Sequence, residues 1–211
     1  MSQPVLFGAR YSVYVRIARL ALHEKGVPYR LEDIDVFGDS AVRAGYLERQ
    51  PFGRIPAFEH DGFWLYETVA ITRYVDEAFA GPALQPATVA ARARMMQAIS
   101  ILDSYAYRPL VWDIYVERVG NPKEGKPADE ARIAAAFPLA RTCFAALGTI
   151  APDAAWLTGS ELTLADLHAA PMFDYVLQAP EGQAMLGAEP RLARWWQHMA
   201  ARPSMIDTPY P

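Results

Sequence analysis

The 211-residue chain contains a single cysteine, Cys143. One thiol excludes an internal disulfide and a thiol cluster around a metal ion, and it favours a reducing, cytoplasmic location. We therefore expect no metal site. The excess of one sign of charge is also small, because the formal net charge is −4 and no long basic run occurs. Nothing in this pattern points to a nucleic-acid partner.

Long apolar runs are absent from the sequence as written. Residues 1–4 lack a charged region followed by an apolar run, so we expect no signal peptide. No stretch reads as long enough to cross a bilayer, and we expect no membrane partner. The chain is nevertheless 52% hydrophobic and 12% aromatic, which is ample for a buried core. Its length allows one large domain or two small ones.

The first part of the chain alternates short apolar runs with helical patterns, in the order β-α-β-α-β-β-α. Ser12 stands before the first helical pattern, and 60–62 is a hairpin signal between two apolar runs. The predicted strands are 5–7, 29–36, 55–59 and 63–66, and the predicted helices are 12–26, 39–49 and 68–79.

The composition changes after a linker at 81–87. Alanine-rich segments follow without a convincing strand. The predicted helices are 88–119 as one helix or two, 129–147 with Pro138 inside it, 163–177 and 190–201, and 121–127 is a predicted loop. The sequence therefore predicts an α/β domain at 1–80 and an all-helical domain at 88–211.

Two backbone features lie one hairpin apart in the first domain. Ile55-Pro56 opens a strand with a proline, where a cis bond can expose unpaired backbone groups. Glu67-Thr68 closes the hairpin and opens a helix, whose free N–H groups favour a carboxylate. Together they predict a groove for a small acidic peptide.

Three segments resemble the glutathione transferase family, in that family's order. Residues 12–26 resemble the first helix of its serine-type members, phi- or theta-like or bacterial. Residues 50–58 with Glu67-Thr68 resemble the glutathione-site segment, and 159–166 resembles the capping box of the helical domain. The resemblance implies a thioredoxin-like domain followed by an all-helical domain, a homodimer, and glutathione as co-substrate without a further cofactor.

In that family a hydroxyl at a helix N-terminus favours the thiolate of glutathione, and Ser12 matches this position. The plain alternative for Ser12 is an N-cap. Tyr11 and Tyr14 are the competing hydroxyls. Arg16, one turn on, either adds positive potential or forms a structural ion pair.

The resemblance places the glutathione backbone against Ile55, with Pro56 in a structural role. Its γ-glutamyl end lies at Glu67 and Thr68. Arg54 is a candidate for the glycyl end, although it is equally well a solvated side chain. Some members hold the glycyl carboxylate with a basic pair, for which this chain offers only Arg43.

The helical domain supplies the second-substrate pocket of the family. The resemblance assigns Tyr107 and Tyr115, with Tyr11 from the first domain, to an apolar pocket for a hydrophobic electrophile. Core packing is an alternative for the nearby Trp112. Other residues of the helical domain have structural roles. These are Thr163 and Asp166 as a capping box, His168 as a buried histidine, and Trp195 and Trp196 as core residues.

The predicted function is conjugation of the glutathione thiolate to hydrophobic electrophiles. The same fold also supports a glutathione-dependent isomerase, dehalogenase or peroxidase, or a non-catalytic glutathione-binding protein. The lack of cysteine before Cys143 argues against a mixed-disulfide mechanism like that of glutaredoxins.

Overall fold

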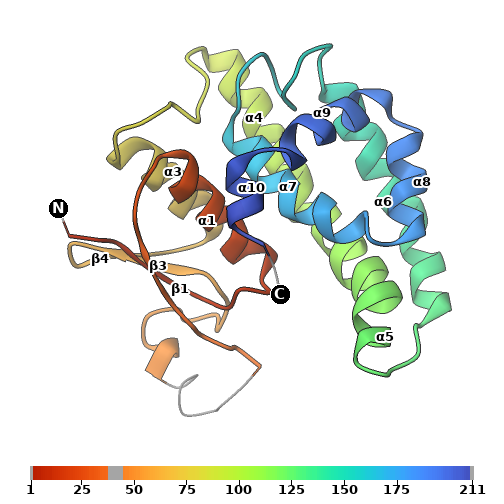
Figure 1. Ribbon diagram of the computed structural model, residues 1–211, viewed down its shortest axis with the longest axis horizontal. Coiled ribbons are helices and arrows are strands. Elements are labelled where there is room, and N and C mark those ends of the chain that lie inside the picture. Colours follow the sequence, from red (N-terminus) through yellow and green to blue (C-terminus); the bar gives the residue numbers. More distant parts are fainter. Residues whose placement is uncertain (1, 38–44, 210–211) are drawn as a thin grey trace. The chain divides into compact units, whose positions relative to one another are not determined.

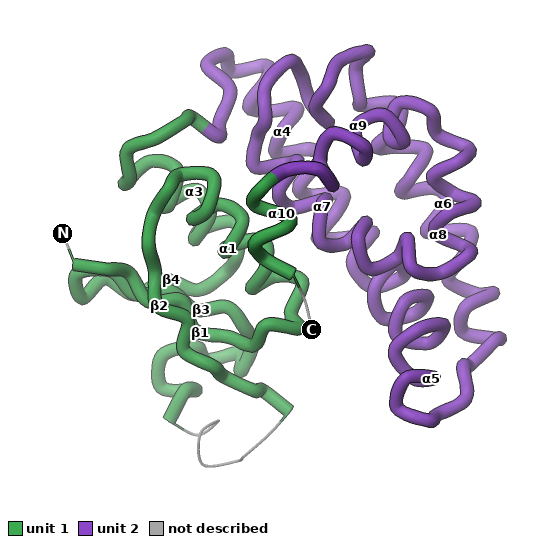
Figure 2. Tube along the Cα trace, viewed as in Figure 1, with its two compact units in different colours: residues 1–83, 203–211 green, residues 84–202 purple. Residues whose placement is uncertain are grey.

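The computed structural model describes residues 2–37 and 45–209. The chain divides into two compact units, one of residues 1–83 with 203–211 and one of residues 84–202 (Figure 2). The last segment therefore belongs with the first unit, whereas the sequence division kept 88–211 together. The helical unit is an insertion between two parts of the first unit.

The first unit is built on a four-stranded sheet of order β2-β1-β3-β4. Figure 1 labels β1, β3 and β4 of this sheet. The strands are β1 (Val5–Phe7), β2 (Arg30–Glu32), β3 (Ala57–His60) and β4 (Phe63–Tyr66). β1 pairs with β2 in parallel and with β3 in antiparallel, and β3 and β4 form the predicted hairpin. The expected strand at 29–36 is thus limited to three residues.

Helices α1 (Val13–Glu24) and α3 (Thr68–Ala78) pack against each other and against the sheet. Apolar side chains at helical spacing on α1 and on strands β1 and β3 are buried, because burying them removes apolar surface from water. Fully buried members of this core are Leu6, Ile17, Leu20, Phe58, Ile71 and Val75. Of the helix predicted at 39–49, only 45–47 are seen to be helical, and 38–44 lie outside the described residues.

The helical unit contains α4 (Val89–Ile101), η1 (Leu102–Ala106), η2 (Arg108–Gly120), α5 (Asn121–Lys123), α6 (Glu130–Ile150), α7 (Leu164–Val176), α8 (Pro180–Gly187) and α9 (Pro190–Ala200). Helix α10 (Pro203–Asp207) belongs to the first unit. The sequence analysis missed α8 and α10 and took α5 for loop. It also expected α-helix where η1 and η2 are π-helical, a form that is rare beyond single turns.

The predicted capping box starts α7. Thr163 and Asp166 cap each other, and the Asp166 carboxylate also accepts hydrogen bonds from the Leu157 N–H at 2.7 Å and from the Trp195 indole at 2.9 Å. Burial raises the pKa of Asp166, and these donors act in the opposite direction. The box therefore joins α7 to α9 and to the preceding loop.

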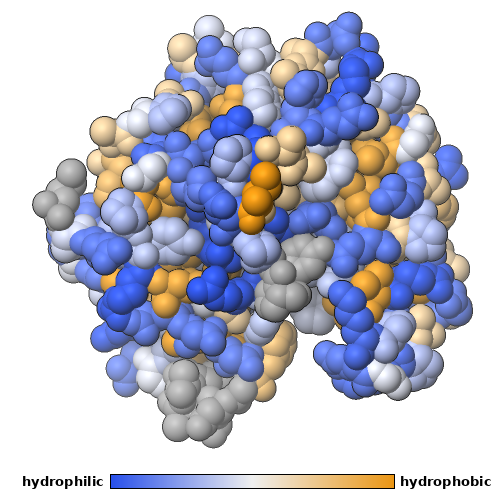
Figure 3. All heavy atoms as spheres, viewed as in Figure 1, coloured by the Kyte–Doolittle hydropathy of each residue, from blue (hydrophilic) through white to orange (hydrophobic). Residues whose placement is uncertain are grey.

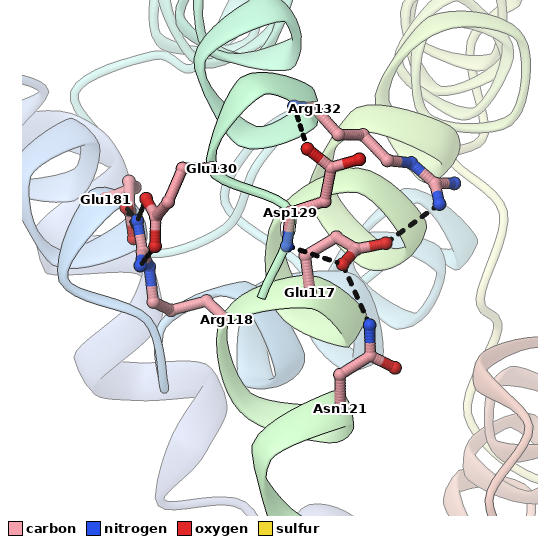
Figure 4. Close-up of polar contacts among 7 residues, drawn as sticks. All are labelled: Glu117, Arg118, Asn121, Asp129, Glu130, Arg132 and Glu181. Carbon is pink, nitrogen blue, oxygen red and sulfur yellow. Dashed lines mark hydrogen bonds and ion pairs between the residues drawn. The ribbon is translucent and has the colours of Figure 1, made fainter. Parts of the chain in front are cut away.

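A network of charged side chains ties the end of η2 to α6 and α8 (Figure 4). Glu117 is buried and accepts hydrogen bonds from Arg132 Nη1 at 2.8 Å, Asn121 Nδ2 at 2.8 Å and the Asp129 N–H at 3.1 Å. Arg118 bridges the carboxylates of Glu130 and Glu181. The buried Glu117 carboxylate is tolerated here because one cation, Arg132, and two neutral donors form hydrogen bonds to it.

Helix α6 corrects the expectation that no stretch of the sequence is long enough to cross a bilayer. It is 21 residues long and apolar enough, by length and composition, to cross a membrane. A core helix passes the same test, and α6 packs on η1, η2, α4, α8 and α9 within its unit. Hydrophilic side chains predominate on the face seen in Figure 3, with smaller hydrophobic patches between them.

Candidate functional site

One end of the sheet brings the predicted glutathione residues together. Phe7 pairs with Ala57, and Ala57 pairs with Tyr66. The loop after β1 leads to Ser12, Ile55-Pro56 leads into β3, and Glu67 follows β4. The three segments therefore meet beside one row of the sheet, and α1 and α3 both begin there. Two helix N-termini at one place favour a negatively charged ligand.

Gly8 marks the closest approach of these segments. A Cβ added to Gly8 would lie 2.4 Å from Val15 Cγ2 and 3.2 Å from Ile55 Cβ. Its backbone has φ 153°, a conformation that side chains disfavour. The missing side chain lets the first turn of α1 pack beside the proline loop. This contact is a tertiary one, so the local sequence pattern gave no signal for it.

Ser12 is the N-cap of α1. Its Oγ accepts a hydrogen bond from the Val15 N–H at 3.3 Å. A serine hydroxyl that accepts one bond still has its hydrogen to donate. The capping role and the role of donor to a thiolate are therefore compatible, and the side chain is half-buried.

Tyr11 is engaged differently. Its hydroxyl donates to Asp35 Oδ1 at 2.8 Å, and its ring stacks on exposed Phe37. Burial and the bond to Asp35 raise the pKa of Tyr11 well above its ordinary value, while the Phe37 N–H and the Tyr11 hydroxyl lower the pKa of Asp35. A phenol committed to a carboxylate is a poorer donor to a thiolate than the hydroxyl of Ser12. Tyr14, the third candidate, is half-buried on α1.

The Ile55-Pro56 peptide bond is cis, as the sequence predicts. Two residues that the sequence analysis did not single out hold the turn before it. Buried Gln50 accepts the Arg54 N–H at 3.1 Å through Oε1, and the buried Tyr46 hydroxyl donates to the Arg54 carbonyl at 2.8 Å. Burial raises the pKa of Tyr46. Both peptide groups next to Arg54 are thus fixed beside Ile55.

Glu67 has φ 71°, which is unusual for a residue other than glycine. It is the N-cap residue of α3, yet its side chain makes no capping hydrogen bond and is exposed. Strained backbone of this kind persists where the surroundings require it, commonly at ligand sites. Thr68, the first residue of α3, is buried. The carboxylate and the first-turn N–H groups are therefore available to a ligand.

The remaining predictions are placed less closely. Arg54 has an exposed side chain, and Arg43 lies outside the described residues. In the helical unit, Tyr107 accepts a hydrogen bond from the Trp112 indole at 3.1 Å, and Trp112 is half-exposed rather than core. Tyr115 is buried and packs edge-on against Tyr175, with ring centroids 4.4 Å apart. Tyr107 is half-buried, so neither tyrosine is fully exposed.

A groove of about 540 Å³ also lies in the helical unit, between α6 and α8. Phe137, Phe144 and Met185 line it together with Arg141 and Glu189, and none of the predicted site residues does. Across residues 2–37 and 45–209, no group of three or more His, Cys, Asp or Glu side chains is arranged to hold a metal ion.

Comparison with known proteins decides the family. Residues 6–83 match the model of the glutathione S-transferase N-terminal domain, and residues 92–203 match that of the C-terminal domain. The chain belongs to the glutathione S-transferase family. The resemblance of three short segments predicted this family and a glutathione transferase as the enzyme class. Both predictions are confirmed.

Individual relatives agree with this assignment. Glutathione S-transferase F11 of Arabidopsis thaliana is 30% identical to this transferase over 190 residues, with 88% of this chain and 87% of the relative covered. Glutathione S-transferase F7 of the same plant is 27% identical over 207 residues, covering 94% and 95%.

Solved structures confirm the fold class of a thioredoxin-like domain with a helical domain. Glutathione transferase F7 from Populus trichocarpa has a TM-score of 0.83 at 25% identity, with 97% of each chain covered. Human glutathione S-transferase T1-1 has a TM-score of 0.82 at 22% identity, covering 97% of this transferase and 85% of the human chain, a likeness of fold alone.

Proposed function

We propose that this transferase joins the thiolate of glutathione to an electrophilic carbon of a hydrophobic compound, with Ser12 as the residue that favours the thiolate. One observation carries the proposal. The Ser12 hydroxyl, the backbone at Ile55 and the Glu67-Thr68 turn converge at one end of the sheet, where α1 and α3 begin. Such a site offers a donor and two helix dipoles to an anion.

The chemistry follows from these groups. The Ser12 O–H and the N-terminus of α1 stabilise the thiolate, so more glutathione is ionised at neutral pH. The thiolate sulfur then attacks the electrophilic carbon, and the leaving group departs with the bonding electron pair. The protein also contributes proximity, because it holds the thiol beside the second substrate.

Glutathione binding is proposed as predicted from the sequence. Its cysteinyl backbone lies along Ile55 as a short added strand. Glu67 attracts the γ-glutamyl ammonium, and the Thr68 hydroxyl and N–H bind the carboxylate. Arg54 is a candidate for the glycyl end. Glu67 combines a positive φ with a side chain that makes no capping hydrogen bond to α3, and both features support this assignment.

The decisive experiment titrates the thiolate absorbance of bound glutathione in Ser12→Ala, Tyr11→Phe and the unmodified protein. Loss of one hydrogen bond to a charged group should raise the thiol pKa by about 1–2 units in Ser12→Ala. Tyr11→Phe should leave it nearly unchanged, because that hydroxyl serves Asp35. If the Ser12→Ala curve superimposes on the unmodified one, Ser12 is only a cap.

The second substrate is proposed to meet an aromatic surface. Tyr11 is 40% exposed beside Ser12, and Phe37 stacks on it. Tyr107 and Tyr115 of the helical unit remain proposed pocket residues. Assays of thiol consumption with aromatic halides, epoxides and hydroperoxides separate conjugation from the peroxidase and dehalogenase alternatives. No consumption with any of them, despite glutathione binding, would favour the non-catalytic alternative.

We also propose a homodimer and a cytoplasmic location. Phe52 is 66% exposed and contacts Tyr66 at the sheet edge formed by β4, with ring centroids 6.0 Å apart. Exposed aromatic side chains at an unpaired sheet edge are typical of an interface. Light scattering should show a dimer, and Phe52→Glu should shift it toward monomer. A monomer in the unmodified protein at micromolar concentration contradicts this proposal.

A further inference from the structure

The C-terminal segment 203–209 docks on α1, the helix that Ser12 caps. Ser204 Oγ donates to Glu24, and His23 Nε2 lies 2.9 Å from Asp207 Oδ2. Arg16 Nη2 donates to the Met205 carbonyl at 3.2 Å. These α1 residues recur at helical spacing and so share one face of the helix. The helix is therefore clamped along its length by chain that follows the entire helical unit.

Two buried arginines stand out on this face. Arg16 is 2% exposed and Arg19 is 3% exposed. Removing a guanidinium from water is costly, and an apolar side chain of similar volume would fill the same space at less cost. An arginine remains charged in proteins. The fold thus retains a permanent positive charge inside the first unit, at a place where packing alone does not require one.

The position of Arg16 relative to Ser12 gives this charge a function. The two residues are four apart, so Arg16 lies about 6 Å further along the helix axis. Residues four apart in a helix also share one face, so Arg16 and Ser12 lie on the same side of α1. A buried charge is also poorly screened by solvent and salt.

We propose that Arg16, held in place by the Met205 carbonyl, is a positioning residue of the glutathione site whose buried charge favours the ionised thiol bound beside Ser12. The inference rests on the proposed function and adds a second source of thiolate stabilisation to it. It also gives segment 203–209 a role in the chemistry, because the Met205 carbonyl of this segment accepts a hydrogen bond from the guanidinium.

The test is the pH titration of thiolate absorbance with glutathione bound, in the full-length protein. Arg16→Gln should raise the thiol pKa by about one unit, the size that Coulomb's law gives for unit charges about 10 Å apart at an effective dielectric of about 20. Arg16→Lys keeps the charge and should restore most of the shift. Where Arg16→Gln does not fold, Arg16→Met supplies an uncharged side chain that fills the buried space.

Asp207→Asn is the control for docking alone, because it weakens the His23 contact and leaves Arg16 charged. It should move the thiol pKa by less than a third of the Arg16→Gln shift. Two results would overturn the role of the charge. One is a thiol pKa shift in Asp207→Asn as large as that in Arg16→Gln. The other is an Arg16→Lys shift as large as that in Arg16→Gln.

Ser12→Ala in the same titration separates this inference from the proposed function. A shift in Ser12→Ala without one in Arg16→Gln overturns the role of Arg16 alone. A bound thiol in the unmodified protein that titrates like free glutathione overturns both.

Discussion

Gly8→Ala is the sharpest test of how the site is assembled, because it adds one methyl group where two site segments meet. The new Cβ would lie 2.4 Å from Val15 Cγ2, whereas carbon atoms in contact are about 3.5–4.0 Å apart. One of the two must move by more than an ångström. Val15 is fully buried in the core, so the strain passes to the first turn of α1 or to Ile55.

The expected cost has two parts. Overpacking of a dense core costs about 1–3 kcal/mol, and a positive φ adds about 1–2 kcal/mol for a residue with a Cβ. We expect the free energy of unfolding to fall by about 2–5 kcal/mol. Glutathione affinity should fall as well, because the methyl group separates the Ser12 turn from the Ile55 backbone.

Gly62→Ala supplies the matched control for this measurement. Gly62 also has a positive φ, 81°, but an added Cβ would meet no atom within 4 Å. The free energy of unfolding of Gly62→Ala should therefore fall only by the conformational part of the cost, about 1–2 kcal/mol. This variant should bind glutathione normally. Urea unfolding and calorimetric titration with glutathione provide both quantities. If Gly8→Ala matches Gly62→Ala in stability and affinity, the close approach of the two segments is not what builds the site.

Three further predictions concern the supports of the site and of the helical unit. Tyr46→Phe should weaken glutathione binding by about 0.5–1.5 kcal/mol in calorimetry, since the Arg54 carbonyl loses its donor. Asp166→Ala should lower the free energy of unfolding by about 3–5 kcal/mol, because it leaves several buried donors unpaired. Arg118 lowers the pKa of Glu130, so the stabilisation from this pair is fully present above the ordinary pKa of 4.5 and is lost as pH falls through the lowered value. Melting temperatures of Glu130→Gln and the unmodified protein should accordingly converge as the solution is acidified below pH 4.5.

The features that could be predicted from the sequence are those with local signals. Ser12 before an apolar helical pattern, the hairpin around 60–62, and the Thr163-Asp166 spacing each report on backbone groups within a few residues. The order of strands and helices in the first unit follows from them. The proline at Ile55-Pro56 likewise carried its own signal, since cis bonds are nearly confined to X-Pro pairs.

The features that were missed depend on distant parts of the chain. Helix α10 is five residues long and is fixed by side chains on α1, so no local periodicity announces it. Tyr46 reads as an ordinary apolar residue until the fold brings its hydroxyl to Arg54. The π-helical form of η1 and η2 leaves no distinct hydrophobic period, so the sequence pattern over 102–120 could not distinguish it from an α-helix.

The insertion of the helical unit into the first unit has a consequence for synthesis on the ribosome. Strands β1 to β4 emerge early, but their partner segment 203–209 appears only after all of 84–202 has been made. Domains otherwise tend to fold in the order in which they emerge. In this chain the helical unit is able to complete its own contacts first, and the glutathione-binding half closes last. A nascent chain stalled before residue 203 would thus carry a formed helical unit beside a first unit whose buried arginines still lack their clamp.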